Sequence, residues 1–136
     1  MAVRALVATK AKPDTVTVAT NIGLLPHFVP LMLASETGTR FRFVQSGGGS
    51  VRLKSVVGGH TELSLFSVPE LVNFKASGIR PIALFTNERN PALPDVPSIG
   101  EAGFKTTFEE RTLLIGPKGI PADRVALLAG AFEVEN

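Results

Sequence analysis

Strand-like and helix-like segments alternate along this chain, and this alternation constrains the fold more than any other feature. Thr15–Thr20 is rich in β-branched residues and is followed by a helical segment at 24–36. The pattern repeats with Phe41–Gln45 and Ser50–Val57. The remaining predicted helices span 3–12, 68–76, 98–102 and 121–132, and the remaining strands span 62–66, 80–85 and 106–115. Such strand–helix–strand units favour an α/β fold, here a three-layer α/β sandwich with a mostly parallel sheet.

Several residues are of the types that begin or end helices. Ser50 and Ser67 are predicted N-caps, while Gly38 and Gly58 are predicted to end the helices before them. Pro30 falls inside the 24–36 segment, so we expect it to bend that helix or to move its start.

Length and charge exclude several classes of protein. The 136 residues suit a single domain spanning 1–136, and 14 basic against 12 acidic residues give a net charge of +2 with no basic run. Nucleic-acid binding is therefore not predicted. The absence of cysteine excludes disulfides, zinc–thiolate sites and thiol catalysis.

The first residues lack an extended apolar segment, so the sequence as written predicts a cytoplasmic location.

Polar and glycine-containing turns follow three of the predicted strands. In parallel sheets, ligands gather at the carboxyl ends of the strands. The turn Thr20–Leu24, with Asn21 and Gly23, follows the first strand, and Ser67–Val68 follows the third. Ser46–Ser50 follows the second strand, ahead of a helix that carries Arg52 and Lys54. Such a turn could cradle an anion with backbone amides, although it does not match a P-loop and an ordinary capped turn is the alternative.

Catalytic and metal sites are not indicated. His27 and His60 occur in no zinc-binding spacing, so both are interpreted as structural or solvent-facing. No G-x-S-x-G elbow occurs, and Glu109-Glu110 is interpreted as a solvated edge. We therefore predict no catalysis, no metal and no cofactor.

Five blocks of sequence form a distinctive set. They are the turn Val18–His27, the glycine pair within Gly58–Glu62, the run Ala76–Leu84, the motif Leu93–Phe104 with Pro94-Asp95-Val96-Pro97, and Gly116–Pro121. Together they resemble the solute receptors of tripartite tricarboxylate transporters, the Bug-type periplasmic binding proteins. The resemblance implies the second lobe of a two-lobed, type II periplasmic-binding-protein fold. It assigns the ligand-binding half-site to Thr20, Asn21, Gly23, Leu24, Ser46, Gly47, Gly48 and Ser67.

The sequence departs from the family at some of these turns. Leu24 replaces a usual serine, Ser67 replaces a frequent aspartate, and Val44-Gln45-Ser46 replaces a Pro-Tyr-Lys pattern. The resemblance implies a small-molecule-binding module for an organic carboxylate, with a membrane permease as the family's partner and the periplasm as its compartment. A homodimer could complete the half-site. The alternative is a non-transport interaction module that forms homo-oligomers and has lost its ligand.

Overall fold

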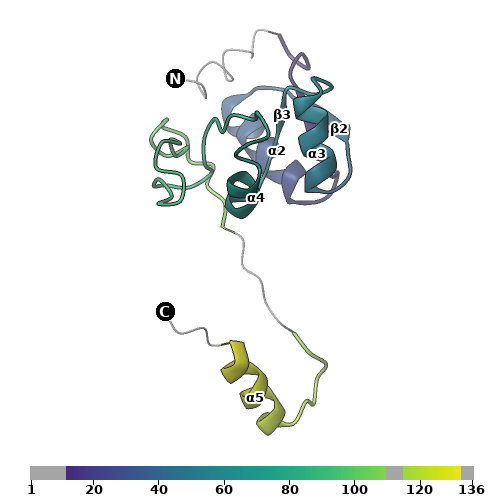
Figure 1. Cartoon of the computed structure of the whole chain (residues 1–136), viewed down its shortest axis with the longest axis vertical. Helices are drawn as coiled ribbons and strands as arrows, with labels where there is room; N and C mark the ends of the chain where they lie inside the picture. The colour runs from purple at the N-terminus through teal and green to yellow at the C-terminus, as the bar shows by residue number, and fades with distance from the viewer. Residues whose placement is uncertain (1–11, 110–114, 133–136) are drawn as a thin grey trace.

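The computed structural model describes residues 12–109 and 115–132 (Figure 1). The predicted helix at 3–12 and the middle of the predicted strand at 106–115 lie outside the described residues. The described elements are β1 (Thr17–Thr20), α2 (Leu25–Thr37), β2 (Arg42–Gln45), α3 (Gly49–Val57), β3 (Leu63–Ser64), α4 (Val68–Asn73) and α5 (Ala122–Phe132).

The three strands form a parallel sheet in the order β2-β1-β3. Ala19 in the central strand pairs with Val44 of β2 on one side and with Ser64 of β3 on the other. Val18 is 2% exposed and Ala19 is not exposed at all, which fits a central strand covered on both faces. The prediction of a parallel α/β fold is therefore confirmed.

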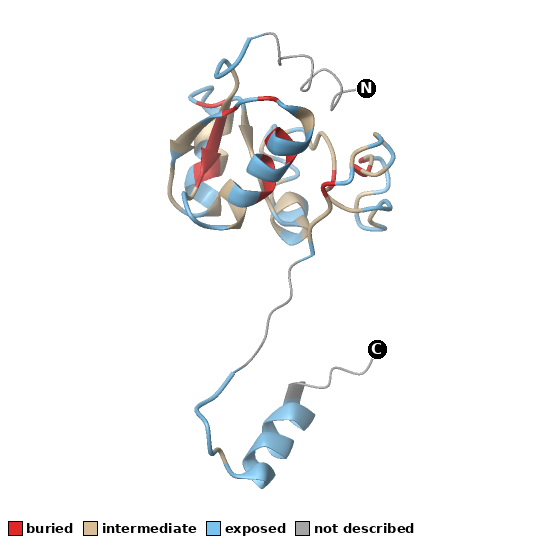
Figure 2. Cartoon of the chain, turned by 180° about the vertical axis from the view of Figure 1, so that it is seen from behind, coloured by how far each residue is buried: buried red, intermediate tan, exposed pale blue. Residues whose placement is uncertain are grey.

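Helices α2 and α3 cover opposite faces of the sheet (Figure 1). Helix α2 connects β1 to the neighbouring strand β2, and α3 connects β2 back across β1 to β3. Because the two connections run in opposite directions, right-handed crossovers place the two helices on different faces. Ala34 of α2 packs with Val18 and Phe41, whereas α3 contacts β1 and β3. The result is three layers, and Figure 2 shows buried residues on β1 and on the inner side of the helices.

The start of α2 is not moved by its internal proline. The helix begins at Leu25, runs through the buried Pro30 and ends at Gly38, which has a φ of 65°. Proline lacks the amide that would bond one turn back, but its buried ring adds apolar contact that offsets this loss.

One of the two predicted serine caps is correct. Ser67 accepts a hydrogen bond from the amide of Glu70, whose side chain bonds back to the amide of Ser67, forming a capping box at α4. Ser50 is not a cap, because α3 begins one residue earlier, with Gly48 at its N-cap and no side-chain cap. Helix α4 also ends at Asn73, short of the predicted boundary at 76.

Two predicted elements near the middle of the chain do not form. The 80–85 segment makes an isolated parallel bridge from Leu84 to Ser98, and the predicted helix at 98–102 is a series of turns. Pro81 has no amide to give to a ladder. The strand predicted at 62–66 is reduced to the two residues of β3.

Arg89 fixes the irregular segment between these positions. Its guanidinium donates to the Glu101 carboxylate at 2.9 Å and to the carbonyl of Pro94 at 2.9 Å. The hydrogen bonds that Arg89 donates to Glu101 lower the pKa of Glu101 and raise the pKa of Arg89. The Pro94–Gly103 motif is thus held by a bidentate pair that shapes the loop.

Glu36 ties the segment after this loop to α2. Its carboxylate accepts hydrogen bonds from the amides of Lys105 at 2.7 Å and Thr106 at 2.9 Å, and from the Thr106 hydroxyl. These bonds, with the Lys105 amide first, lower the pKa of Glu36 from 4.5.

A carboxylate whose pKa is lowered by folding stabilises the fold above its unfolded pKa, and the gain is lost as pH falls through the folded pKa. We expect Glu36→Gln to lower the melting temperature at neutral pH, with the gap from wild type closing as pH falls below 4.5. Thermal melts between neutral and acid pH would measure this gap. Glu88→Gln, at an exposed loop position, is the matched control. A gap independent of pH would contradict the role of the carboxylate charge.

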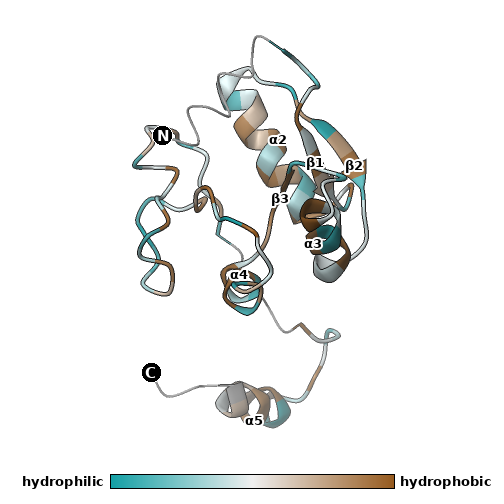
Figure 3. Ribbon diagram, turned by 45° about the horizontal axis from the view of Figure 1, so that its top comes forward, coloured by the Kyte–Doolittle hydropathy of each residue, from teal (hydrophilic) through white to brown (hydrophobic). Residues whose placement is uncertain are grey.

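Helix α5 lies apart from the sheet (Figures 1 and 2). Its residues from Ala122 to Ala131 are exposed, including Val125, Leu127 and Leu128 at 50%, 69% and 47%. Figure 3 shows the tan and brown colours of hydrophobic residues along it. Among the described residues, no helix has the length and apolarity needed to cross a membrane.

Candidate functional site

The turns after β1 and β2 are joined by hydrogen bonds at the carboxyl edge of the sheet. The Ser46 amide donates to the carbonyl of Thr20 at 2.7 Å, and the Ile22 amide donates to Gln45 Oε1 at 2.8 Å. Gly23 has a φ of 85°, a conformation that glycine adopts without the steric cost of a Cβ. The first two predicted binding turns therefore lie side by side.

Arg52 extends this connection to the third strand. Its Nη1 donates to Asn21 Oδ1 at 3.1 Å and to the carbonyl of Gly47 at 3.5 Å, while its Nη2 donates to the carbonyl of Leu65 at 3.3 Å. One guanidinium thus bonds to the turns after all three strands. A planar group with five fixed donors suits this task, which a lysine ammonium could not reproduce.

The position of Arg52 follows from the glycines before α3. The helix starts at Gly49, so residue 52 falls in its first turn, beside the strand ends. Arg52 is 6% exposed, and its guanidinium carbon lies 5.5 Å from the centroid of the Phe66 ring. The ring face and the carbonyls partly compensate for removing this cation from water.

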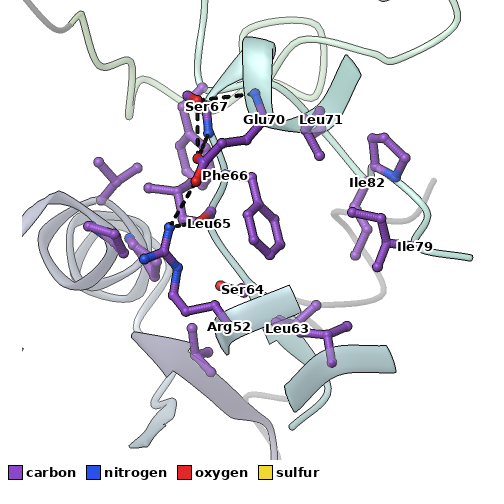
Figure 4. A pocket seen from close by; sticks show the side chains of 18 of the residues that line it. Arg52, Leu63, Ser64, Leu65, Phe66, Ser67, Glu70, Leu71, Ile79 and Ile82 are labelled. Carbon is purple, nitrogen blue, oxygen red and sulfur yellow. Dashed lines mark hydrogen bonds and ion pairs between the residues drawn. The ribbon is translucent and has the colours of Figure 1, made fainter. Parts of the chain in front are cut away.

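The third predicted turn joins the site through Glu70. Ser67 Oγ and the Ser67 amide lie 3.1 and 2.8 Å from Glu70 Oε2, and Glu70 Oε1 is 3.7 Å from Arg52 Nη2. Figure 4 shows Arg52, Ser67 and Glu70 directed toward one another. The Glu70 side chain keeps 32% of its surface exposed, so this ion pair is reached by solvent.

Two polar atoms at this edge are buried without a partner. Within the part of the chain that the structure describes, these are Thr20 Oγ1 and Arg52 Nε. Buried polar atoms are normally satisfied, so such exceptions often occur at binding or catalytic sites.

The other predicted site residues have local roles or lie at the margin. Leu24 is 58% exposed at the N-cap of α2, and Gly48 is the N-cap of α3. The Gly23 amide donates to Nδ1 of His27 at 3.4 Å, and the His27 ring packs edge-on against Phe43 at 4.7 Å. These contacts give His27 a structural role, in line with its interpretation from sequence.

A cavity of about 1080 Å³ opens beside the site. Apolar side chains from β3, the turn after it, α4 and the 79–82 segment form much of its lining, among them Leu63, Leu65, Phe66, Leu71, Ile79 and Ile82 (Figure 4). Arg52, Ser67 and Glu70 supply a polar corner. Apolar walls with a few convergent polar groups are typical of small-molecule sites. No group of three potential metal ligands occurs among residues 12–109 and 115–132.

Residues 2–135 match the family described as "Tripartite tricarboxylate transporter family receptor". This chain belongs to that receptor family. It is 28% identical over 127 residues to a UPF0065 protein from the tcbD–tcbE intergenic region of Pseudomonas sp. strain P51, covering 90% of this chain and 38% of that protein. It is 25% identical over 122 residues to protein BugT of Bordetella pertussis, covering 88% and 37%. The chain therefore spans under two-fifths of these curated relatives.

The fold of a solved structure agrees with this assignment. A TctC solute-binding protein from Polaromonas, crystallised without ligand, superposes with a TM-score of 0.68 at 22% identity. The match covers 95% of this chain and 45% of that protein. Receptors of this family bind solutes for transport.

Three residues that join the turns of the candidate site are absent from the half-site that the resemblance assigned, although Arg52 was named with Lys54 beside the predicted anion-binding turn. Arg52, Gln45 and Glu70 make the contacts that join the turns. The S-x-x-E spacing from Ser67 is a signal for Glu70, since it is the pattern of a capping box. The inward direction of Arg52 had no comparable signal, because a helical arginine is usually exposed.

Proposed function

We propose that this chain binds a small organic carboxylate at the carboxyl edge of its sheet, as part of a transport receptor. The observation that carries the proposal is the Arg52 guanidinium, which is 6% exposed and bonds to the turns after β1, β2 and β3. It supplies fixed positive charge where backbone amides and hydroxyls converge. Such a donor set suits a carboxylate, with which it forms charge-assisted hydrogen bonds.

The same donor set supports binding without chemical conversion. A hydrolytic or acyl-transfer site needs a nucleophile within reach of a base. The Ser67 hydroxyl bonds to Glu70 within a helix cap, and the buried Thr20 hydroxyl has no hydrogen-bond partner among the described residues. We therefore propose a role without catalysis or cofactor, and a membrane permease as the partner. For a receptor of this family, the periplasm is the compartment in which that partner is met.

A titration followed by amide NMR tests the binding proposal. We expect succinate or benzoate to shift the amides of Asn21, Gly47 and Ser67 in the ¹⁵N-labelled chain, at up to about 10 mM because one lobe covers one side of a ligand. Succinamide and benzyl alcohol, which lack the charge, are the matched controls. No shift at these amides with either acid, or equal shifts with the neutral controls, would contradict carboxylate binding.

A second candidate function, self-association, is favoured by the exposed side chains of α5. Val125, Leu127 and Leu128 remain at least 47% exposed on a helix that is itself outside the sheet. Covering such a face with a second copy would remove apolar surface from water. Light scattering over a range of concentrations tests this candidate. A mass that stays at that of one chain would reject it, whereas a dimer abolished by Leu128→Asp would support it.

A further inference from the structure

The carboxylate of Glu70 lies at the N-terminus of α3, a position suited to an anion. A methyl group placed on Gly49, the first residue of α3, would overlap Glu70 Oε1. The same carboxylate is 3.7 Å from Arg52 Nη2 and accepts from the Ser67 amide at 2.8 Å. A side chain from α4 thus lies over the start of α3, beside the Arg52 guanidinium.

This end of α3 is suited to a negative charge for two independent reasons. No side chain caps it, so its first amides and the helix dipole point outward. Arg52 beside it is 6% exposed, and its Nε has no hydrogen-bond partner among the described residues. A bound carboxylate would accept from both, whereas Glu70 Oε1 lies 3.7 Å from Arg52 Nη2, beyond hydrogen-bond distance.

We propose that Glu70 is a built-in competitor that occupies the carboxylate position of the binding site until a ligand displaces it. This inference rests on the proposed carboxylate-binding function. Displacement is sterically feasible, because the Glu70 side chain is 32% exposed and can turn toward solvent. The glycine at position 49 keeps the space in which either carboxylate fits.

The cavity beside this position defines the class of ligand. Leu65 and Phe66 line it near the Arg52 corner, and Leu71, Ile79 and Ile82 line the side across from Arg52 (Figure 4). A carboxylate that replaced Glu70 would place the rest of the molecule against these walls. The site therefore takes a monocarboxylate with an apolar body, such as an aromatic or branched acid, in preference to a compact dicarboxylate.

Removing the Glu70 carboxylate tests whether it competes with a bound ligand. An intramolecular group has an effective concentration of roughly millimolar order, so we expect Glu70→Ala to bind benzoate about tenfold more tightly than wild type. The readout is the shift of the Gly49 and Ser67 amides in the full chain titrated with benzoate, with succinate as the second probe. Glu88→Gln removes one exposed carboxylate elsewhere and should bind like wild type.

Two further variants keep the result interpretable. The Glu70→Ala variant loses its helix cap and could unfold for that reason. Glu70→Gln removes the charge but keeps a residue that completes the capping box, so we expect it to stay folded and to gain affinity for benzoate. Adding Gly49→Ala to the Glu70→Ala variant should abolish the gain, because the new methyl fills the anion position.

The outcomes separate this inference from the proposed function. Equal benzoate affinity in wild type, Glu70→Ala and Glu70→Gln, with shifts at Asn21 and Gly47, overturns the competitor while carboxylate binding stands. No binding by any folded variant overturns both. Binding of succinate to the wild-type chain as tight as that of benzoate overturns the preference for an apolar body.

Discussion

Replacing Arg52 with alanine is expected to destabilise the fold by about 2–4 kcal/mol and to abolish carboxylate binding. The loss leaves Asn21 Oδ1 and the carbonyls of Gly47 and Leu65 without this donor, at an edge where the side chain is 8% exposed. It also leaves Glu70 at the start of α3 without its nearby cation. Denaturant unfolding gives the stability change, and the benzoate titration gives the loss of binding.

Arg40→Ala is the matched control for this prediction. Arg40 pairs with Asp14 at 2.7 Å, but the two side chains are 71% and 47% exposed. Exposed ion pairs contribute about 0–1 kcal/mol, so this variant should resemble wild type. Arg52→Lys should recover part of the stability at most, because one ammonium cannot reach three acceptors in different turns. A variant Arg52→Ala as stable as the Arg40→Ala control would refute the structural role of the guanidinium.

Replacing Ile99 with alanine is expected to cost about 3–4 kcal/mol of unfolding free energy. Ile99 is 1% exposed and packs with Leu33 of α2, surrounded by Ile82, Phe85 and Phe104. The deletion would leave a void between α2 and the irregular segment. The Ile99 amide also donates to the carbonyl of Leu84 at 2.7 Å, so the backbone around the void is held in place and relaxes little.

Ile115→Ala makes the same chemical change at a residue that is 86% exposed. It should alter stability by less than about 0.5 kcal/mol, as surface substitutions usually do. Equal midpoints for the two variants in the same denaturant series would show that the Leu33–Ile99 cluster does not contribute to the stability of the fold.

The parallel direction of β1, β2 and β3 and the intervening helices α2 and α3 were predictable from sequence, whereas the strand order was not. Strand-like segments and the glycines that end helices reflect local backbone preferences, and these preferences agree here with the tertiary structure. The 80–85 segment was not predictable in the same way. Its strand-like composition needs a partner strand, and the structure gives Leu84 a single bridge to Ser98.

The candidate site was likewise predictable only in part from the sequence. The residue types at Thr20, Asn21, Gly47 and Ser67, together with their places after strands, identified the edge at which they meet. That edge holds its shape through a guanidinium that contacts three separate turns, and sequence carries no record of contacts across distant positions.

The sequence by itself determined the α/β architecture, the family and the three turns that face one edge. These depend on local patterns and on blocks that resemble the family, such as Pro94-Asp95-Val96-Pro97. The tertiary structure alone decided that Arg52 is buried and that Glu70 lies on the end of α3. The physical reason is that burial and charge pairing depend on which elements pack together, and a single chain position does not encode its partners.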